Sequence, residues 1–161
     1  MTGYMCHVDS PLGCIVLTGT RNGLSKITFQ STSPPARNAP GPGYMQEARK
    51  QLLEYLRGER TKFAVPLDIQ GTPFQLQVWQ ALQEIPYGHT ASYADIAASI
   101  GNPRACRAVG GANNTNPVPI VIPCHRVIGR NGRLVGYGSG VWRKRLLLEL
   151  EGRTLQQDPG L

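Results

Sequence analysis

The chain has 161 residues, of which 40% are hydrophobic and 17% are charged. This length allows one domain or two small ones with a buried core, and the composition excludes a fully disordered chain. No apolar run approaches the roughly 20 residues of a membrane-spanning helix, and the N-terminus lacks the basic and apolar segments of a secretory signal. We therefore expect no membrane association, an intracellular location (cytoplasm or nucleoid, or the nucleus in a eukaryote) and cysteines in the thiol form.

The formal net charge is +7 at pH 7, and one stretch of the chain is purely basic. Between Asp95 and Glu149 the sequence holds no acidic residue, whereas it holds seven Arg and one Lys. Arg side chains form paired hydrogen bonds with phosphates and fit beside bases. The stretch favours a polyanionic partner such as nucleic acid; a solvated basic surface that keeps the protein soluble is the alternative.

The first 71 residues are expected to form a small α/β unit. Residues 13–18 and 24–29 have the composition of strands, and an Asn-Gly pair between them indicates a hairpin. Large apolar side chains recur at every second position from 63 to 69, which predicts a third strand. Pro66 restricts that strand to the edge of the sheet, because proline cannot donate a ladder hydrogen bond.

A helix is expected between the hairpin and the third strand. Residues 31–43 contain four prolines and predict an exposed connection. Four apolar residues then recur at helical spacing, and Gly58 stands where the helix would end. They are Met45, Ala48, Leu52 and Leu56.

The second half begins with two helix starts of the same kind. Thr72 and Ser92 each open a capping-box pattern, and Pro73 adds a proline at the first helical position. The segment 101–103, Gly-Asn-Pro, ends the second helix and starts another, expected over about 103–112. Two short helices across a tight turn that contains Gly indicate a helix-turn-helix.

The second helix of this pair carries mostly Ala and Gly, with Arg104 and Arg107 three residues apart. Small side chains let a helix approach a shallow or narrow groove closely, which suits sequence-tolerant contact with DNA. Ordinary packing of helix on helix is the alternative, against which the two Arg argue. A last helix is expected from about Val141 to Leu150, with Leu146, Leu147 and Leu150 toward the core, followed by a frayed tail over 154–161.

The most informative stretch is 118–127, an apolar run that ends in Cys124-His125-Arg126-Val127. Its prolines make it too stiff for a helix and too poor in donors for a central strand, which predicts a fixed, buried backbone. Cysteine attacks as the thiolate, and a neighbouring His lowers its pKa. Adjacent side chains of an extended backbone point to opposite sides, so His125 reaches Cys124 only if the backbone turns or a water relays the proton.

Two less specific interpretations of the same stretch stay open. For a Cys-His pair taken alone, a buried structural cysteine with an incidental His125 beside it is the favoured explanation of Cys124. Metal binding is weakly supported, because the Cys-His pairs lack the usual spacings of zinc ligands.

The string Pro123-Cys124-His125-Arg126-Val127 resembles the O6-alkylguanine-DNA alkyltransferase (methylated-DNA–protein-cysteine methyltransferase) family. It is preceded by Arg-Ala-Val-Gly-Gly-Ala at 107–112 and Asn-Pro at 116–117, and residues 9–13 resemble the start of the family's N-terminal domain. The resemblance implies a ribonuclease H-like α/β domain over 1–71. It further implies a mostly α, winged-helix-like alkyl-acceptor domain over 72–153 and a tail over 154–161.

The resemblance implies DNA repair by direct, irreversible transfer of an alkyl group from O6 of guanine, and also O4 of thymine, to Cys124. The nucleotide would flip out first, each molecule would act once, and no cofactor would be needed. The partner would be double-stranded DNA that contains O6-alkylguanine. A monomer, able to act cooperatively on DNA, would grip the minor groove with little sequence preference.

By position, His125 matches the residue that deprotonates Cys124 through a water, and Glu151 matches the acid that orients His125. Asn116 matches the residue that braces the active-site turn, Tyr93 the tyrosine that bonds N3 of the leaving guanine, and Arg107 the side chain that fills the gap in the base stack. Further DNA contacts would come from Asn102, Arg104, Ala105 and Arg130. The substrate pocket would be lined by Pro119, Val127, Tyr137, Gly138 and Ser139.

Two departures from the family pattern carry expectations. Gly138-Ser139-Gly140 stands where relatives commonly carry Ser-Gly-Gly or Ala-Gly-Gly, which predicts weaker reaction with O6-benzylguanine than with O6-methylguanine. Thr20 and Ser25 occupy two positions at which some relatives bind a structural zinc, so no metal is expected. Two other classes of protein are alternatives. A non-reacting binder of damaged DNA is disfavoured because Cys124 is present, and nothing in the basic stretch or the helix-turn-helix favours a Cys-His hydrolase.

Overall fold

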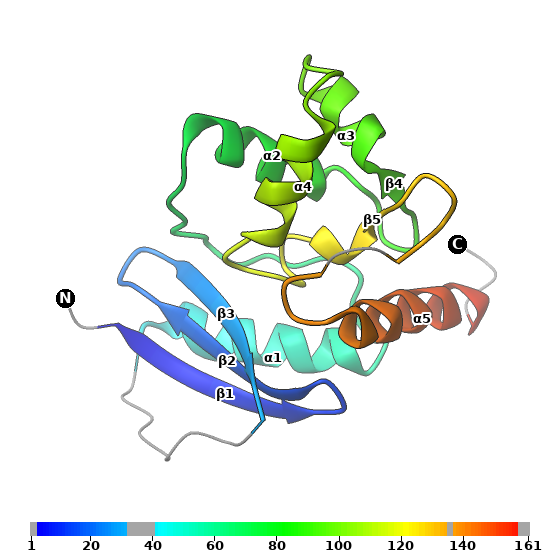
Figure 1. The fold of residues 1–161 in the computed structure, drawn as a ribbon. Helices are drawn as coiled ribbons and strands as arrows, with labels where there is room; N and C mark the ends of the chain where they lie inside the picture. Colours follow the sequence, from blue (N-terminus) through cyan, green and yellow to red (C-terminus); the bar gives the residue numbers. More distant parts are fainter. Residues whose placement is uncertain (1–2, 32–40, 135–136, 158–161) are drawn as a thin grey trace. The chain divides into compact units, whose positions relative to one another are not determined.

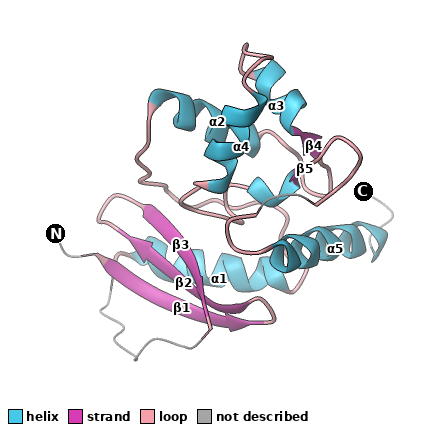
Figure 2. Cartoon of the chain, in the orientation of Figure 1, coloured by secondary structure: helices cyan, strands magenta, loops and turns pink. Residues whose placement is uncertain are grey.

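The computed structural model describes residues 3–31, 41–134 and 137–157. Contacts within the chain divide it into two compact units, Met1–Gln70 and Gly71–Leu161. Figures 1 and 2 show the sheet and its helix in the first unit and a group of helices in the second, of which α5 (Val141–Gln157) is the longest. None of the described helices is long and apolar enough to cross a membrane.

The first unit is an antiparallel sheet covered by one helix. Its strands β1 (Tyr4–Ser10), β2 (Gly13–Gly19) and β3 (Leu24–Gln30) pair in the order β1-β2-β3. Helix α1 (Gly43–Leu56) packs on β1 and β2. The hairpin between β2 and β3 and the helix are both confirmed, whereas β1 was not predicted. Most of the predicted connection before α1 lies outside the described residues.

The end of α1 follows the sequence prediction. Gly58 has φ +76°, the left-handed conformation that glycine adopts most readily, and its N–H donates to the carbonyl of Tyr55 at 3.0 Å. The helix buries Met45, Ala48, Gln51, Leu52 and Tyr55.

The predicted third strand over 63–69 is wrong. Only a single parallel bridge joins Leu67 to Leu24 among the described residues of this segment. The backbone N–H and C=O of Ala64 bind instead to the buried side chain of Gln51, at 2.8 and 3.3 Å. An amide side chain from α1 therefore satisfies backbone groups that a neighbouring strand would otherwise pair.

The second unit is mainly helical. Its elements in chain order are α2 (Pro73–Gln83), β4 (Ala91–Ser92), α3 (Tyr93–Ser99), α4 (Cys106–Asn114), the 3₁₀ helix η1 (Cys124–Arg126), β5 (Val127–Ile128) and α5 (Val141–Gln157). Both capping boxes are present, Thr72 with Gln75 and Ser92 with Asp95. Helices α3 and α4 pack on each other and on α2, and β4 pairs with β5 in parallel.

The two helices of the predicted helix-turn-helix are present, but α4 begins later than expected. Residues 103–105 form a turn, closed by a hydrogen bond from Ala105 N–H to the carbonyl of Asn102 at 3.0 Å. The helical pattern begins only beyond it, at Cys106. Gly101, with φ +80°, makes the sharp bend between the helices.

Helix α5 is longer than predicted, and the expected frayed tail is wrong for residues 154–157, which belong to it. Thr154 Oγ1 donates to the carbonyl of Leu150 at 2.9 Å within the helix. Of the three predicted core leucines, Leu147 is buried, whereas Leu146 and Leu150 are half-buried. The face of α5 that carries Leu147 also buries two charged residues, Lys144 and Glu151.

Candidate active site

A braced turn leads into the candidate nucleophile. Asn116 Nδ2 donates to the carbonyl of Ile122 at 2.7 Å, and Asn116 Oδ1 accepts from the backbone N–H of Val118 at 2.9 Å. Between these points Ile120 has φ +77°, which costs a β-branched residue on the order of 1–3 kcal/mol. The stiff, buried backbone predicted for this stretch is present, and Asn116 fixes both sides of its strained residue.

Cys124, His125 and Arg126 form η1, a single 3₁₀ turn in which all three residues are buried. The N–H of Arg126 donates to the carbonyl of Pro123 at 3.0 Å. Asn113, buried on α4, donates its side-chain N–H to the carbonyl of Cys124 at 3.4 Å. Because the backbone turns here, the objection that neighbouring side chains point to opposite sides does not apply.

One carboxylate organises the centre of the site. Glu151, 1% exposed on α5, lies with Oε2 2.6 Å from His125 Nε2. It also accepts from Arg126 Nε and Nη2 at 2.9 and 3.0 Å, and from the backbone N–H of Gly88 at 3.0 Å. Arg126 Nη1 in turn donates to the carbonyl of Ile85 at 2.8 Å. Buried charges in this group are thus paired and hydrogen-bonded.

These contacts determine the protonation states of Glu151 and His125. Burial raises the pKa of Glu151, but the hydrogen bonds and charges of His125 and Arg126 outweigh it and lower that pKa to about 2. Burial lowers the pKa of His125, and the nearby carboxylate opposes this only in part. Glu151 is therefore ionised and His125 neutral at pH 7. With Nε2 donating to Glu151, Nδ1 is the ring nitrogen that can accept a proton.

The thiol of Cys124 is protonated at rest. Burial raises the pKa of Cys124 to about 11, although the nearby polar side chains of Asn116 and Tyr137 and the charge of Lys144 oppose this. A thiol with such a pKa needs a base at the moment of attack. The next residue, His125, provides a neutral imidazole in the same turn.

Lys144 was not identified from the sequence as part of this site. It was counted, with Arg126, among the cations of the basic stretch, but both side chains are buried. Burial lowers the pKa of Lys144, and the neighbouring Cys124 opposes this. Helical spacing provides a signal that could have found it, because Lys144, Leu147 and Glu151 are three and four residues apart and share one helix face.

Two tyrosines lie beside the thiol. Tyr137 is buried, and burial together with the nearby Cys124 raises the pKa of its phenol. Tyr93, the first residue of α3, lies beside α4, since a Cβ placed on Gly110 would be 3.8 Å from its ring. Burial raises the pKa of Tyr93, and Cys124 raises it further. Both phenols therefore keep their protons at pH 7 and are able to donate hydrogen bonds.

The remaining predicted pocket residues differ in position. Pro119 and Val127 are buried, Ser139 is half-buried and Gly138 is exposed. A Cβ on Gly138 would lie 2.9 Å from the backbone oxygen of Asn114, so a side chain there requires the loop to shift. Glycine at position 138, where relatives commonly carry Ser or Ala, therefore fits the close approach of the Asn114 backbone.

The predicted DNA contacts stay accessible, most of them on or just before α4 and Arg130 in the loop after β5. Asn102, Arg104, Arg107 and Arg130 are exposed, and Ala105 is half-buried just before α4. The same helix buries Val109, Ala112 and Asn113, and Trp79 Nε1 donates to the carbonyl of Ala112 at 2.8 Å. Helix packing and an exposed, small, basic surface therefore occupy different faces of α4.

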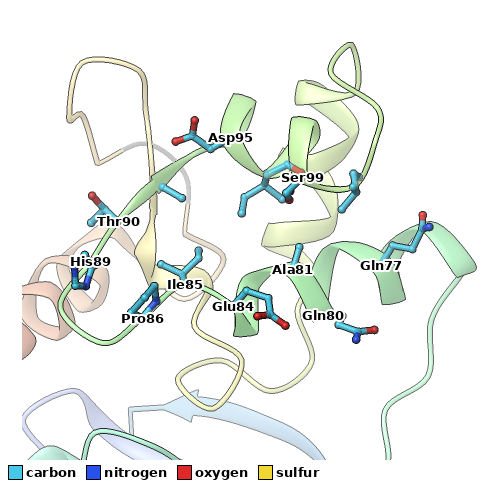
Figure 3. A pocket seen from close by; sticks show the side chains of 13 residues that line it. Gln77, Gln80, Ala81, Glu84, Ile85, Pro86, His89, Thr90, Asp95 and Ser99 are labelled. Atoms are coloured by element: carbon cyan, nitrogen blue, oxygen red, sulfur yellow. Dashed lines mark hydrogen bonds between the residues drawn. The ribbon is translucent and has the colours of Figure 1, made fainter.

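A cavity of about 670 Å³ opens elsewhere, between α2, α3 and the loop that joins them (Figure 3). Its lining includes Ala81, Ile85 and Ile96, with Glu84 and Asp95 among its polar residues. Cys124, His125 and Glu151 do not line it. Within the described part of the chain, no three His, Cys, Asp or Glu residues gather as a metal-ligand group.

Comparisons with known proteins cover almost the whole chain. Family profiles described as "6-O-methylguanine DNA methyltransferase" match residues 3–69 (ribonuclease-like domain) and 73–153 (DNA binding domain). A methylated-DNA–protein-cysteine methyltransferase of Mycobacterium tuberculosis is 51% identical over 147 residues, which is 89% of each chain.

Solved structures agree with these matches. The crystal structure of M. tuberculosis O6-methylguanine methyltransferase has a TM-score of 0.84 at 48% identity, covering 95% of this chain and 94% of its own. That of M. tuberculosis OGT in complex with DNA has a TM-score of 0.83 at 49% identity, covering 92% of each chain. The predicted family and fold class are thereby confirmed: the chain belongs to the 6-O-methylguanine DNA methyltransferase family.

Proposed function

We propose that this chain repairs double-stranded DNA by transferring an alkyl group from O6 of guanine to Sγ of Cys124. One observation carries the proposal: a buried thiol directly precedes a neutral histidine that a buried, ionised carboxylate holds at 2.6 Å. Relatives named methylated-DNA–protein-cysteine methyltransferases support it, as does a related structure in complex with DNA. A match to the family's DNA-binding domain supports DNA as the partner.

The reaction begins with removal of the thiol proton. Nδ1 of His125 accepts it through a bridging water, and Glu151 stabilises the imidazolium that results. The positive charge of Lys144 and the nearby polar groups of Asn116 and Tyr137 stabilise the thiolate. The base, its orienting acid and the nucleophile then have the same roles as in hydrolase triads.

The thiolate next attacks the alkyl carbon on O6. A carbon–sulfur bond forms while the carbon–oxygen bond breaks, and the electron pair of that bond stays on guanine. The phenol of Tyr93 donates a hydrogen bond to N3 of the departing guanine, which spreads and stabilises its charge. Transfer from O4 of thymine follows the same course. A thioether is not reversed by thiol exchange, so each molecule acts once.

Access to O6 requires the nucleotide to leave the duplex, at a cost of about a few kcal/mol. Arg107, exposed on α4, fills the gap left in the base stack. The exposed small residues of α4, Ala108 and Gly111, suit close approach to the minor groove with little sequence preference. A monomer carries out the reaction, and several copies bind one DNA cooperatively.

The test is the intact mass of the protein after mixing with a duplex oligonucleotide that contains one O6-methylguanine. We expect the mass to rise by one methyl group, located by peptide mapping on Cys124. The Cys124→Ala variant should bind the same duplex in a gel-shift assay without any gain in mass. A gel shift of the wild-type protein with unchanged mass would leave only a non-reacting binder, and methyl on another residue would refute the site.

A further inference from the structure

The turn formed by residues 137–140 lies directly against the reactive thiol. Tyr137 is buried, and its phenol lies close enough to Cys124 for each group to shift the pKa of the other. The N–H of Gly140 donates to the carbonyl of Tyr137 at 2.8 Å, which closes the turn. Whatever holds this turn from outside therefore sets the space beside Cys124 that an alkyl group must enter.

Two residues in the first turn of α5, Trp142 and Arg143, hold it from outside. Arg143 Nη1 donates to the carbonyl oxygen of Ser139, and the backbone N–H of Arg143 donates to the carbonyl of Gly140 at 3.1 Å. The guanidinium carbon lies 4.3 Å from the centroid of the Trp142 ring, which is a cation–π contact. The two side chains thus form one stacked layer on the turn.

Gly140 shows how closely this layer approaches the backbone. Its φ is +102°, and a Cβ built on it would lie 3.1 Å from both Cδ1 and Nε1 of Trp142. The indole therefore covers Gly140 at contact distance. Trp142 nevertheless stays 49% exposed, so the ring belongs to a surface contact with the turn and not to the core.

Arg143 also acts electrostatically on the group that touches the thiol. Burial raises the pKa of Tyr137 well above its ordinary value, Cys124 raises it further, and the positive charge of Arg143 opposes both. Loss of the Arg143 side chain would therefore remove a charge next to Tyr137 together with the hydrogen bond to Ser139.

We propose that Trp142 and Arg143 form a clamp that sets the width of the alkyl pocket and so determines which alkyl groups reach Cys124. The inference rests on the proposed alkyl transfer. With the clamp in place, the turn stays close to Cys124 and admits small groups such as methyl. Without the clamp, the turn loosens and bulky groups enter more easily. Transfer of methyl becomes slower, because the hydroxyl of Tyr137 is no longer held beside Cys124.

The test compares second-order rate constants for O6-methylguanine and O6-benzylguanine. Both are supplied as free bases, so that DNA affinity does not enter, and the intact mass of the protein is the readout. Trp142→Ala and Arg143→Ala should each raise the benzyl-to-methyl rate ratio by roughly threefold to tenfold. Arg143→Lys keeps the charge but not the planar fork, and should raise the ratio less.

Two variants serve as matched controls. Trp142→Phe keeps an aromatic ring over Gly140, and Arg145→Ala removes an equal charge from an exposed site on the same helix. Both should keep the wild-type ratio.

Three results would overturn the clamp. One is an unchanged benzyl-to-methyl rate ratio in Trp142→Ala and Arg143→Ala while both rate constants fall together. Loss of folded protein alone would produce this result. Another is a rise of equal size in Arg145→Ala. The third is failure of the wild-type protein to accept an alkyl group at Cys124 from either base or from DNA, which would refute the proposed function as well. The first two results would refute the clamp alone, because the wild-type protein would still be alkylated at Cys124.

Discussion

Replacing Glu151 by Gln removes the carboxylate that pairs with the buried side chains of His125 and Arg126. The pKa of Glu151 falls from its ordinary 4.5 to about 2 in the folded protein, and each unit is worth about 1.4 kcal/mol. The ionised carboxylate therefore stabilises the fold by about 3 kcal/mol. Leaving the Arg126 charge without it places the expected loss of stability at pH 7 at about 3–5 kcal/mol.

The sign of the pH dependence follows from the lowered pKa. The stabilisation is fully present above the unfolded pKa of 4.5 and is lost as the pH falls through 4.5 toward 2. Burial of neutral His125 also weakens the fold below about pH 6.5 in both proteins, and more so in the variant, because the Glu151 charge that supports protonated His125 is lost. This second effect opposes the first, so the difference in stability between wild type and Glu151→Gln should shrink by at most about 3 kcal/mol between pH 7 and pH 2.

Urea unfolding followed by circular dichroism at several pH values measures this difference. Glu149→Gln is the matched control, because Glu149 is exposed on the same helix, and it should change stability by less than about 0.5 kcal/mol at any pH. A difference for Glu151→Gln that stays constant from pH 7 to pH 2 would refute the reasoning, since it would show that the charge of Glu151 is not what stabilises the fold.

Four further outcomes are expected for the reaction. Glu151→Gln should raise the apparent pKa of the reactive thiol in the pH profile of alkylation, because His125 loses the charge that supports its protonated form; an unmoved profile would remove Glu151 from the relay. Lys144→Met should raise the same apparent pKa, because a buried positive charge near Cys124 is lost, whereas Arg145→Met should not. Arg107→Ala should slow repair of duplex DNA by about tenfold or more but leave reaction with free O6-methylguanine unchanged, since only the duplex requires extrusion; equal slowing on both would contradict the stack-filling role. Wild-type protein should react more slowly with O6-benzylguanine than with O6-methylguanine, and equal second-order rate constants would contradict the effect assigned to Gly138 and Ser139.

Features whose physics is local could be predicted from the sequence. Thr72 and Ser92 open α2 and α3 as predicted, because each capping box is completed by a residue three positions later. Gly58 ends α1 for a similarly local reason, its left-handed backbone. The string around Cys124 identified the family because its five residues follow a helix-turn-helix at a fixed distance.

Features that depend on residues far away in the sequence could not be predicted. The segment around Ala64 has the alternation of a strand, yet its backbone binds the side chain of Gln51, thirteen residues away on α1. Lys144 and Arg126 have the composition of a DNA-binding surface, but tertiary packing buries both. Their burial depends on how α5 packs on η1. The pattern of apolar residues within either segment does not indicate this packing.

The four hydrogen-bonding contacts of Glu151 join three separate stretches of the second unit, namely the loop at Gly88, the turn at His125 and Arg126, and α5. If one of these stretches opens alone, a charged or polar group of the others loses its hydrogen-bond or ion-pair partner. Local fraying, which proteins commonly show at functional loops, is therefore suppressed around the sulfur. The centre stays assembled or melts cooperatively with its surroundings, so Cys124, His125 and Glu151 keep the geometry that the proposed transfer requires.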